Sequence, residues 1–285
     1  MDQTMLKLAN GSIVPKLGLG TWYLGDSPAT FDRERQALQE GVAAGMTLID
    51  TAEMYGGGRS ERLVGAAIKN MEREKLFIVS KVLPSNAGRN RIFKSCEDTL
   101  KRLGTDYLDL YLLHWRGSVP LSETVKCMEE LKQQGKIRSW GVSNFDIDDM
   151  EELWRVPGGK NCLVNQVLYH MGSRGIEFSL LPWMREHNVA LMAYCPLAQA
   201  GSLRRGLLTN PTVKKIAQKH GATVEQVLLA WCVRDGNTIA IPRSGRPEHV
   251  LDNAGAKNVV LDEADLEEID QAYWPPRRKE YLDMQ

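Results

Sequence analysis

The feature that most constrains the fold is an alternation, repeated eight times, of a short apolar run with a longer amphipathic segment. The apolar runs lie at 17–21, 47–50, 76–81, 108–114, 138–143, 163–166, 189–194 and 238–241. Several of them, such as LFIVSKV and LDLYLLHW, are nearly continuous rather than alternating, which is typical of parallel strands buried on both faces. Eight strand–helix units in about 250 residues predict a (β/α)8 TIM barrel of the α/β class. An open doubly wound sheet is the alternative.

A hairpin signal precedes the eight units. Leu6 and Leu8 alternate with polar residues, and the chain returns through a second short apolar run at 13–14. Between them, Asn10-Gly11 predicts a type I′ turn, in which both central residues have positive φ. No linker or low-complexity segment interrupts the chain, so we expect residues 1–285 to form a single domain.

The charge balance excludes some classes of partner. The chain has 36 basic and 36 acidic residues, for a formal net charge of zero. Nucleic acid and anionic membranes attract clearly basic surfaces, so neither is expected as a partner. The sequence begins MDQT, without the features of a signal peptide, and no run approaches the about 18 apolar residues of a membrane span. We therefore expect a soluble cytoplasmic protein, and a monomer, because no long apolar stripe calls for a partner chain.

The five cysteines form no CxxC pair. Each stands alone in an apolar or helical context, at positions 96, 127, 162, 195 and 232. This pattern predicts buried free thiols rather than disulfides or a metal site.

Polar residues interrupt the apolar runs at their carboxyl ends, where barrel enzymes place their active sites. Asp50 ends the second run, with Tyr55 five residues later, Lys81 ends the third and His114 the fourth. These ends follow one another at intervals of about 30 residues, one strand–helix unit each, so their side chains are expected to converge. The next runs end in Ser143, Asn144, Gln166 and Tyr194. Taken singly, each has a local alternative; Asp50, for example, suits a turn or a helix cap.

At these residues the sequence resembles the aldo-keto reductase superfamily. The matching segments are GLGTW (18–22), LIDTAEMYGGGRSE (48–61), FIVSKV (77–82), DYLDLYLLHW (106–115), GKIRSWGVSNF (135–145), NQVLYH (165–170), AYCPLAQAG (193–201) and IPRSG (241–245). They occur in the family's order over nearly the whole chain, and bacterial reductases of small aldehydes such as methylglyoxal are the most similar members. The resemblance implies a barrel whose bottom is closed by the N-terminal hairpin, with extra C-terminal helices.

The resemblance also implies NADPH-dependent reduction of aldehydes and ketones to alcohols. Tyr55 would be the general acid, assisted by Asp50, Lys81 and His114. A free tyrosine has a pKa near 10, and a neighbouring ammonium is expected to lower that pKa. Asp50 would hold Lys81 charged and in place, while His114 would orient the carbonyl oxygen of the substrate.

Cofactor contacts follow from the same resemblance. Ser143, Asn144 and Gln166 would hold the nicotinamide carboxamide, and Tyr194 would stack on the nicotinamide. The 195–202 loop would cover the pyrophosphate. The full set is Gly20, Thr21, Trp22, Asp50, Ser143, Asn144, Gln166, Tyr194, Cys195, Pro196, Leu197, Gln199, Ser202, Ile241, Arg243, Ser244, Arg246, His249 and Asn253.

The predicted site for the 2′-phosphate departs from the usual family pattern. Arg243, Ser244 and Arg246 stand at the entrance to a helix, which favours an anion. Arg243 replaces the usual lysine, however, and His249 replaces an arginine that stacks on adenine, whereas Asn253 matches an adenine contact. NADPH is therefore expected as cofactor, with NADH the less favoured alternative.

Substrate contacts are expected from aromatic and sulfur-containing side chains that follow strand ends. Trp22, Met54 and Trp115 would wall the pocket beside His114; ordinary packing is the alternative for each. The tail after Tyr273 is short and charged. This predicts an open pocket that accepts many small carbonyl compounds.

Two other functions compete with this prediction. Lys81 would form a Schiff base in a lysine-dependent aldolase, but a carboxylate neighbour opposes the depressed pKa that such chemistry needs. The second alternative is a barrel that binds its cofactor without catalysing a reaction.

The Gly18-Leu19-Gly20 triplet lacks the third glycine of a Rossmann loop and instead predicts close packing.

Overall fold

Eight parallel strands form a closed barrel. The computed structural model describes residues 3–199 and 201–284, and for residues 201–203 it describes the backbone alone. The strands are β3 (Leu19–Gly20), β4 (Leu48–Asp50), β5 (Phe77–Val82), β6 (Leu108–Leu113), β7 (Ile137–Ser143), β8 (Val164–Leu168), β9 (Ala190–Tyr194) and β10 (Thr238–Ala240), each paired with the next. Gly18 N donates to Ala240 O at 2.8 Å and Gly20 N to Pro242 O at 3.0 Å, which joins the two edges. The barrel is confirmed, and the open sheet is wrong.

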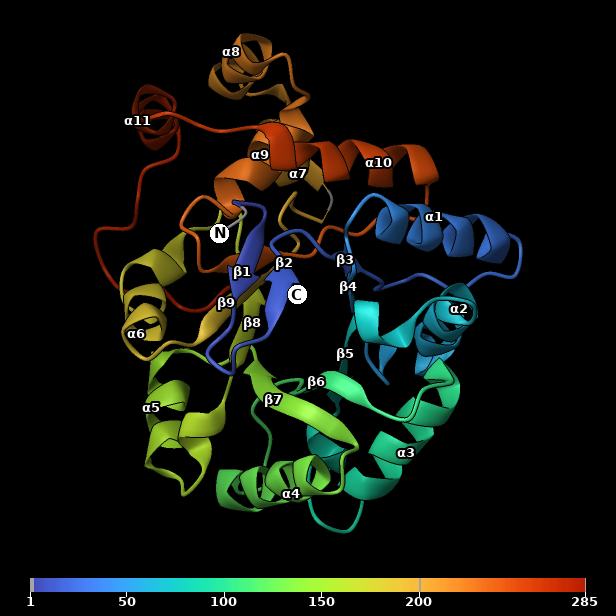
Figure 1. Ribbon diagram of the computed structural model, residues 1–285. Helices are drawn as coiled ribbons and strands as arrows, with labels where there is room; N and C mark the ends of the chain where they lie inside the picture. Colours follow the sequence, from blue (N-terminus) through green and yellow to red (C-terminus); the bar gives the residue numbers. More distant parts are fainter. Residues whose placement is uncertain (1–2, 200, 285) are drawn as a thin grey trace.

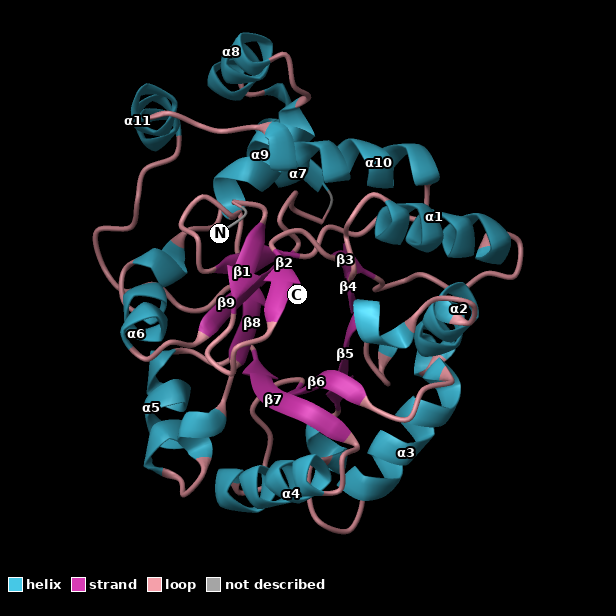
Figure 2. Ribbon diagram, in the orientation of Figure 1, coloured by secondary structure: helices cyan, strands magenta, loops and turns pink. Residues whose placement is uncertain are grey.

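Helices surround the strands in a ring (Figure 2). They are α1 (Phe31–Ala43), α2 (Arg59–Ile68), α3 (Ile92–Leu103), α4 (Leu121–Gln133), α5 (Ile147–Arg155), α6 (Leu180–Glu186), α7 (Gly201–Thr209), α8 (Pro211–His220), α9 (Val224–Cys232), α10 (Pro247–Gly255) and α11 (Glu263–Ala272). Helix α10 packs against α1, and α11 packs against α8. Helices α7 to α11 lie together at the top of Figure 1.

The N-terminal hairpin covers one end of the barrel (Figure 1). Strands β1 (Met5–Lys7) and β2 (Ile13–Pro15) pair antiparallel. Leu6, Leu8 and Val14 are buried in the same apolar cluster as side chains of the barrel interior, including those that begin β4 and β8. The hairpin therefore closes the amino-terminal ends of the strands and leaves the carboxyl ends open for the site.

The turn of this hairpin differs from the prediction. Gly11 N donates to Leu8 O, and Leu8 N donates to Ser12 O, so three residues rather than two form the loop. Gly11 has φ +90°, whereas Asn10 has no positive φ. The predicted type I′ turn is wrong; the bonds fit a turn followed by one left-handed glycine, the common three-residue hairpin loop.

Gly18 and Gly20 lie where the barrel closes, with neighbouring atoms too near for a side chain. A Cβ on Gly20 would lie 2.7 Å from Ile241 O, and one on Gly18 would lie 2.6 Å from a methyl group of Leu48. The predicted role in close packing is confirmed.

The five cysteines are thiols rather than disulfides. Four of them are buried as predicted, but Cys195 is only partly buried, because it lies in the wall of a pocket. Within the described residues, no helix combines the length and the apolar character needed to cross a bilayer. Nor does any group of three or more His, Cys, Asp or Glu side chains in this part of the chain suit a metal ion.

Candidate active site

Lys81 is the centre of a buried polar cluster at the open end of the barrel. Its Nζ lies 2.7 Å from Asp50 Oδ2, 2.9 Å from Thr51 O and 3.0 Å from the hydroxyl of Tyr55. Asp50 ends β4, Lys81 lies on the neighbouring β5, and Tyr55 begins a short 3-10 helix, η1 (Tyr55–Gly57). All three of these ionisable side chains are buried. The structure therefore brings together the predicted lysine, aspartate and tyrosine.

Asp50 connects this cluster to the opposite side of the barrel. Its Oδ1 accepts a 2.7 Å hydrogen bond from Gln166 Nε2 on β8, while Oδ2 faces Lys81. Burial raises the pKa of Asp50 and lowers the pKa of Lys81, and the attraction between the two charges opposes both shifts. Each group is therefore the main stabilising partner of the other.

The structure corrects the prediction that Lys81 lowers the pKa of Tyr55. The pKa of its phenol is raised well above its usual value, because burial and the Asp50 carboxylate disfavour a phenolate. The expected lowering by Lys81 is wrong for this structure, since desolvation has the larger effect. The phenol is consequently protonated at neutral pH, which is the state that a proton donor needs.

His114 follows β6 and faces Tyr55. Their rings lie edge to face, with centroids 5.7 Å apart. Burial, aided by the charge of Lys81, lowers the pKa of His114 to about 2, and its Nδ1 has no hydrogen-bond partner among the described residues. The imidazole is therefore neutral over the physiological range and carries one N–H.

This buried histidine predicts acid sensitivity. Between pH 6.5 and 2 the unfolded chain binds a proton at His114 that the folded chain does not, so stability falls as the pH falls through this window. We expect His114 alone to lower the free energy of unfolding by about 2 kcal/mol between pH 7.5 and pH 5. Urea unfolding of the His114→Gln variant at both pH values should show a correspondingly smaller difference.

The exposed His249 provides the control. His249→Gln should keep the pH dependence of the wild type. An equal pH dependence in wild type and His114→Gln would contradict the assignment.

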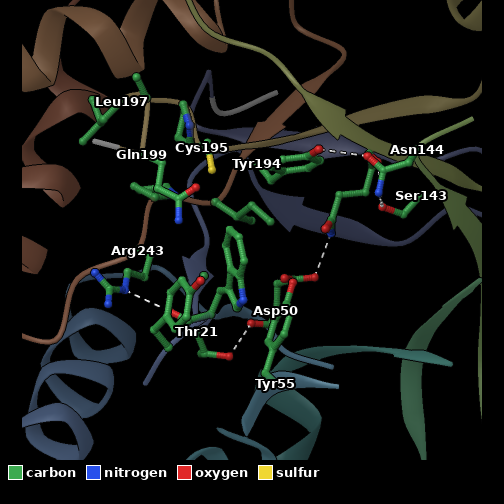
Figure 3. Close-up of a pocket in the computed structure, with 18 of the residues that line it drawn as sticks. Thr21, Asp50, Tyr55, Ser143, Asn144, Tyr194, Cys195, Leu197, Gln199 and Arg243 are labelled. Atoms are coloured by element: carbon green, nitrogen blue, oxygen red, sulfur yellow. Dashed lines mark hydrogen bonds between the residues drawn. The ribbon is translucent and has the colours of Figure 1, made fainter. Parts of the chain in front are cut away.

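A pocket of about 990 Å³, open mouth included, lies above this cluster. Figure 3 shows Asp50 and Tyr55 on one wall and Ser143 and Asn144 on another, with the loop that carries Cys195, Leu197 and Gln199 opposite them. The predicted residues that line it are Gly20, Thr21, Trp22, Asp50, Met54, Tyr55, His114, Trp115, Ser143, Asn144, Gln166, Tyr194, Cys195, Pro196, Leu197, Gln199, Ile241 and Arg243.

Three predicted polar residues, Tyr194, Asn144 and Ser143, are linked along one wall, where Asn144 Nδ2 donates to Ser143 Oγ at 3.3 Å. Tyr194 donates from its hydroxyl to Asn144 Oδ1 at 2.9 Å, and Asn144 Nδ2 donates to His114 O at 3.2 Å. Ser143 Oγ donates to Gln166 O at 2.9 Å. The wall therefore offers both donors and acceptors in fixed positions.

Most of the described non-glycine residues with a strained backbone conformation line the same pocket. The described residues other than glycine that have positive φ are Tyr23, Asn144, Asn188, Cys195 and Ala198, and all but Asn188 line the pocket. A left-handed conformation is costly for side chains such as these, and it recurs where function fixes the backbone.

The remaining predicted cofactor residues lie beyond the pocket lining. Ser244 and Arg246 form the turn that begins α10, where Arg246 N donates to Ser244 Oγ at 3.2 Å. On α10, His249 is exposed and Asn253 is buried. The side chain of Ser202 is outside the described part of the structure.

Sequence reasoning missed three residues that line the pocket, Tyr23, Arg204 and Pro242, whereas Ala198 belongs to the 195–202 loop that was expected there. Arg204, on α7, donates to Ala198 O at 3.2 Å and so holds the strained loop. Tyr23 stacks on Trp22 with ring centroids 4.6 Å apart. Tyr23 could have been predicted, because it directly follows the predicted pocket residue Trp22. Arg204 could not, because it lies far from any strand end.

Comparison with known proteins agrees with this geometry. The sequence pattern of the aldo/keto reductase family matches residues 16–273. Methylglyoxal reductase YeaE of Escherichia coli K12 is 51% identical over 284 residues, covering 100% of both chains. Glyoxal reductase of Bacillus subtilis 168 is 35% identical over 93% of this chain and 91% of that protein. A crystal structure of an aldo/keto reductase from Klebsiella pneumoniae in complex with NADP and acetate is 50% identical, with a TM-score of 0.96 and 99% of each chain covered. The chain therefore belongs to the aldo-keto reductase family.

Proposed function

We propose that this protein is an NADPH-dependent reductase of small aldehydes and ketones, with methylglyoxal-type compounds as substrates. One observation carries the proposal: the Tyr55 hydroxyl lies 3.0 Å from a buried Lys81 ammonium at the base of an open pocket. The names of the similar E. coli and B. subtilis proteins, methylglyoxal reductase and glyoxal reductase, agree with it.

The pocket suits a nicotinamide dinucleotide. Ser143, Asn144 and Gln166 present the donors and acceptors that a carboxamide requires. Arg204 and Arg243 also line the pocket, and neither forms an ion pair with another described residue, so two cations are available to phosphates. The Klebsiella relatives were crystallised with NADP and with NADPH. When bound, NADPH supplies the hydride.

The chain's own residues would supply the proton and the orientation. Tyr55 would donate its phenolic proton to the carbonyl oxygen of the substrate. The Lys81 ammonium would stabilise the phenolate that remains, while Asp50 holds that ammonium in place. The neutral His114 would donate one hydrogen bond to the same carbonyl oxygen.

The outer pocket is consistent with a broad range of small substrates. Met54 is 38% exposed and Trp115 36% exposed, and both line the pocket together with Trp22. These side chains would form an apolar rim around the substrate carbon atoms.

A lysine-dependent aldolase is less consistent with the geometry. Lys81 Nζ has three hydrogen-bond partners, and Lys81 does not line the pocket, so its amine is not presented to a substrate carbonyl.

The remaining expectations extend the proposal. Residues 1–285 would act as one reductase domain, consistent with a barrel closed between segments from both ends of the chain. The protein would work as a cytoplasmic monomer; its five cysteines, none of them in a disulfide, suit a reducing compartment.

The direct test mixes the protein with NADPH and a panel of small aldehydes that includes methylglyoxal, and follows the loss of nicotinamide absorbance. Turnover with several aldehydes is expected. No turnover with any of them would overturn the proposal.

Arg243→Ala should weaken the binding of NADPH more than that of NADH. Arg243 Nε donates to Trp22 O at 2.9 Å, which leaves the other guanidinium N–H groups for a phosphate. Loss of a charge-assisted bond of this kind predicts an increase in the NADPH Kd of about tenfold or more. Fluorescence titration with both cofactors measures it, and equal losses would show that Arg243 does not read the 2′-phosphate.

A further inference from the structure

Helix α1 packs against the turn formed by residues 243–246. Arg33 Nε donates to Gly245 O at 3.2 Å. A Cβ on Gly245 would lie 2.9 Å from Glu34 Cγ, so the first turn of α1 is in contact with this backbone. A segment more than 200 residues away in the sequence thus places a guanidinium beside the turn that carries Arg243 and Arg246.

Three arginines lie on these two adjacent segments, one on α1 and two in the turn. Arg33, Arg243 and Arg246 are exposed, and none forms an ion pair with another described residue. By contrast, Arg35 on the same helix pairs with Asp32 at 3.2 Å. The like charges of three guanidinium groups repel one another, and a bound anion would remove that cost.

The nearby carboxylates do not neutralise the cluster. The carboxylate of Glu34 accepts from Gly25 N at 2.7 Å and from Thr30 Oγ1 at 2.8 Å. Its Oε1 would lie 3.4 Å from a Cβ on Gly245, so it lies beside the turn, but it forms no ion pair with another described residue. Glu248 lies in the first turn of α10 and forms no ion pair among the described residues. Three arginines and two carboxylates, Glu34 and Glu248, thus lie on these segments without ion pairs among the described residues, which leaves a net positive charge.

We infer that Arg33 is a specificity-determining residue that binds the 2′-phosphate of the cofactor together with Arg243 and Arg246. Only Nε of Arg33 donates to Gly245 O, so both terminal nitrogens of its guanidinium can donate to phosphate oxygens. Arg33 supplies this cation from α1, the element that packs against the turn. The inference rests on the proposed function, because it assigns a residue to the cofactor of that reaction.

The test measures the binding of 2′,5′-ADP and 5′-AMP, which differ by the 2′-phosphate, to the full chain by calorimetry. Arg33→Met should weaken 2′,5′-ADP about tenfold and change 5′-AMP less than twofold. Its salt dependence for 2′,5′-ADP should also be shallower. Arg35→Met is the matched control on the same helix and should bind both ligands as the wild type does.

Three results would overturn the inference. Equal weakening of both ligands in Arg33→Met would indicate a structural role in holding the turn, and Arg33→Lys, which keeps the charge, would then behave like Arg33→Met. No weakening of either ligand would place Arg33 outside the site. A wild type that binds 2′,5′-ADP no more tightly than 5′-AMP would instead overturn the proposed NADPH preference, and the inference with it.

Discussion

Tyr55→Phe is expected to lower kcat for aldehyde reduction by about 10³, with the Kd for NADPH changed less than twofold. The hydroxyl of Tyr55 is the pocket phenol that touches the Lys81 ammonium, so its removal eliminates the proton donor. The ring itself remains, and so do its contacts with Trp22 and His114. Steady-state kinetics with methylglyoxal and fluorescence titration with NADPH measure the two quantities separately.

A second tyrosine offers a matched control. Tyr111 on β6 is fully buried, and its hydroxyl has no hydrogen-bond partner among the described residues. Tyr111→Phe removes the same atom from the same barrel and should leave kcat unchanged. Normal turnover by Tyr55→Phe, or an equal loss in both variants, would show that Tyr55 is not the general acid.

The barrel could be predicted from the sequence because its signals are local. Each buried strand is a short apolar run, and a polar residue at its carboxyl end marks the face that carries the site. The hairpin turn could not be predicted in the same way. Asn10 Nδ2 donates to Ser139 Oγ at 2.8 Å, and this contact spans 129 residues. Such a tertiary contact overrides the local preference of the Asn-Gly pair for a type I′ turn.

The members of the candidate site were predictable, but their electrostatics were not. Lys81 beside Tyr55 favours a lowered pKa when the pair is considered alone. In the barrel, both groups lose contact with water, and desolvation raises the pKa of the phenol instead. The contact of Arg33 with Gly245 could not be predicted for a related reason, because a contact between α1 and a turn 212 residues away arises only in the folded chain.

The buried pair of Lys81 and Asp50 predicts the largest loss of stability. Lys81→Met should lower the free energy of unfolding by about 3–5 kcal/mol, because it leaves the Asp50 carboxylate buried without its cation. Asp50→Asn should have a similar effect by leaving the ammonium unpaired. Both variants should also lose most activity. Urea unfolding at pH 7.5 measures the first quantity, and the rate of NADPH oxidation measures the second.

The double variant, Asp50→Asn with Lys81→Met, separates the two roles of the pair. It buries no charge, so it should recover much of the stability lost by either single variant. Its activity should remain low, because no ammonium is left to stabilise the phenolate of Tyr55. Lys94→Met, which breaks the exposed pair with Asp98, should leave unfolding nearly unchanged. Single variants as stable as the wild type would show that the pair adds nothing to folding, and a double variant that regained activity would show that catalysis does not depend on the ammonium.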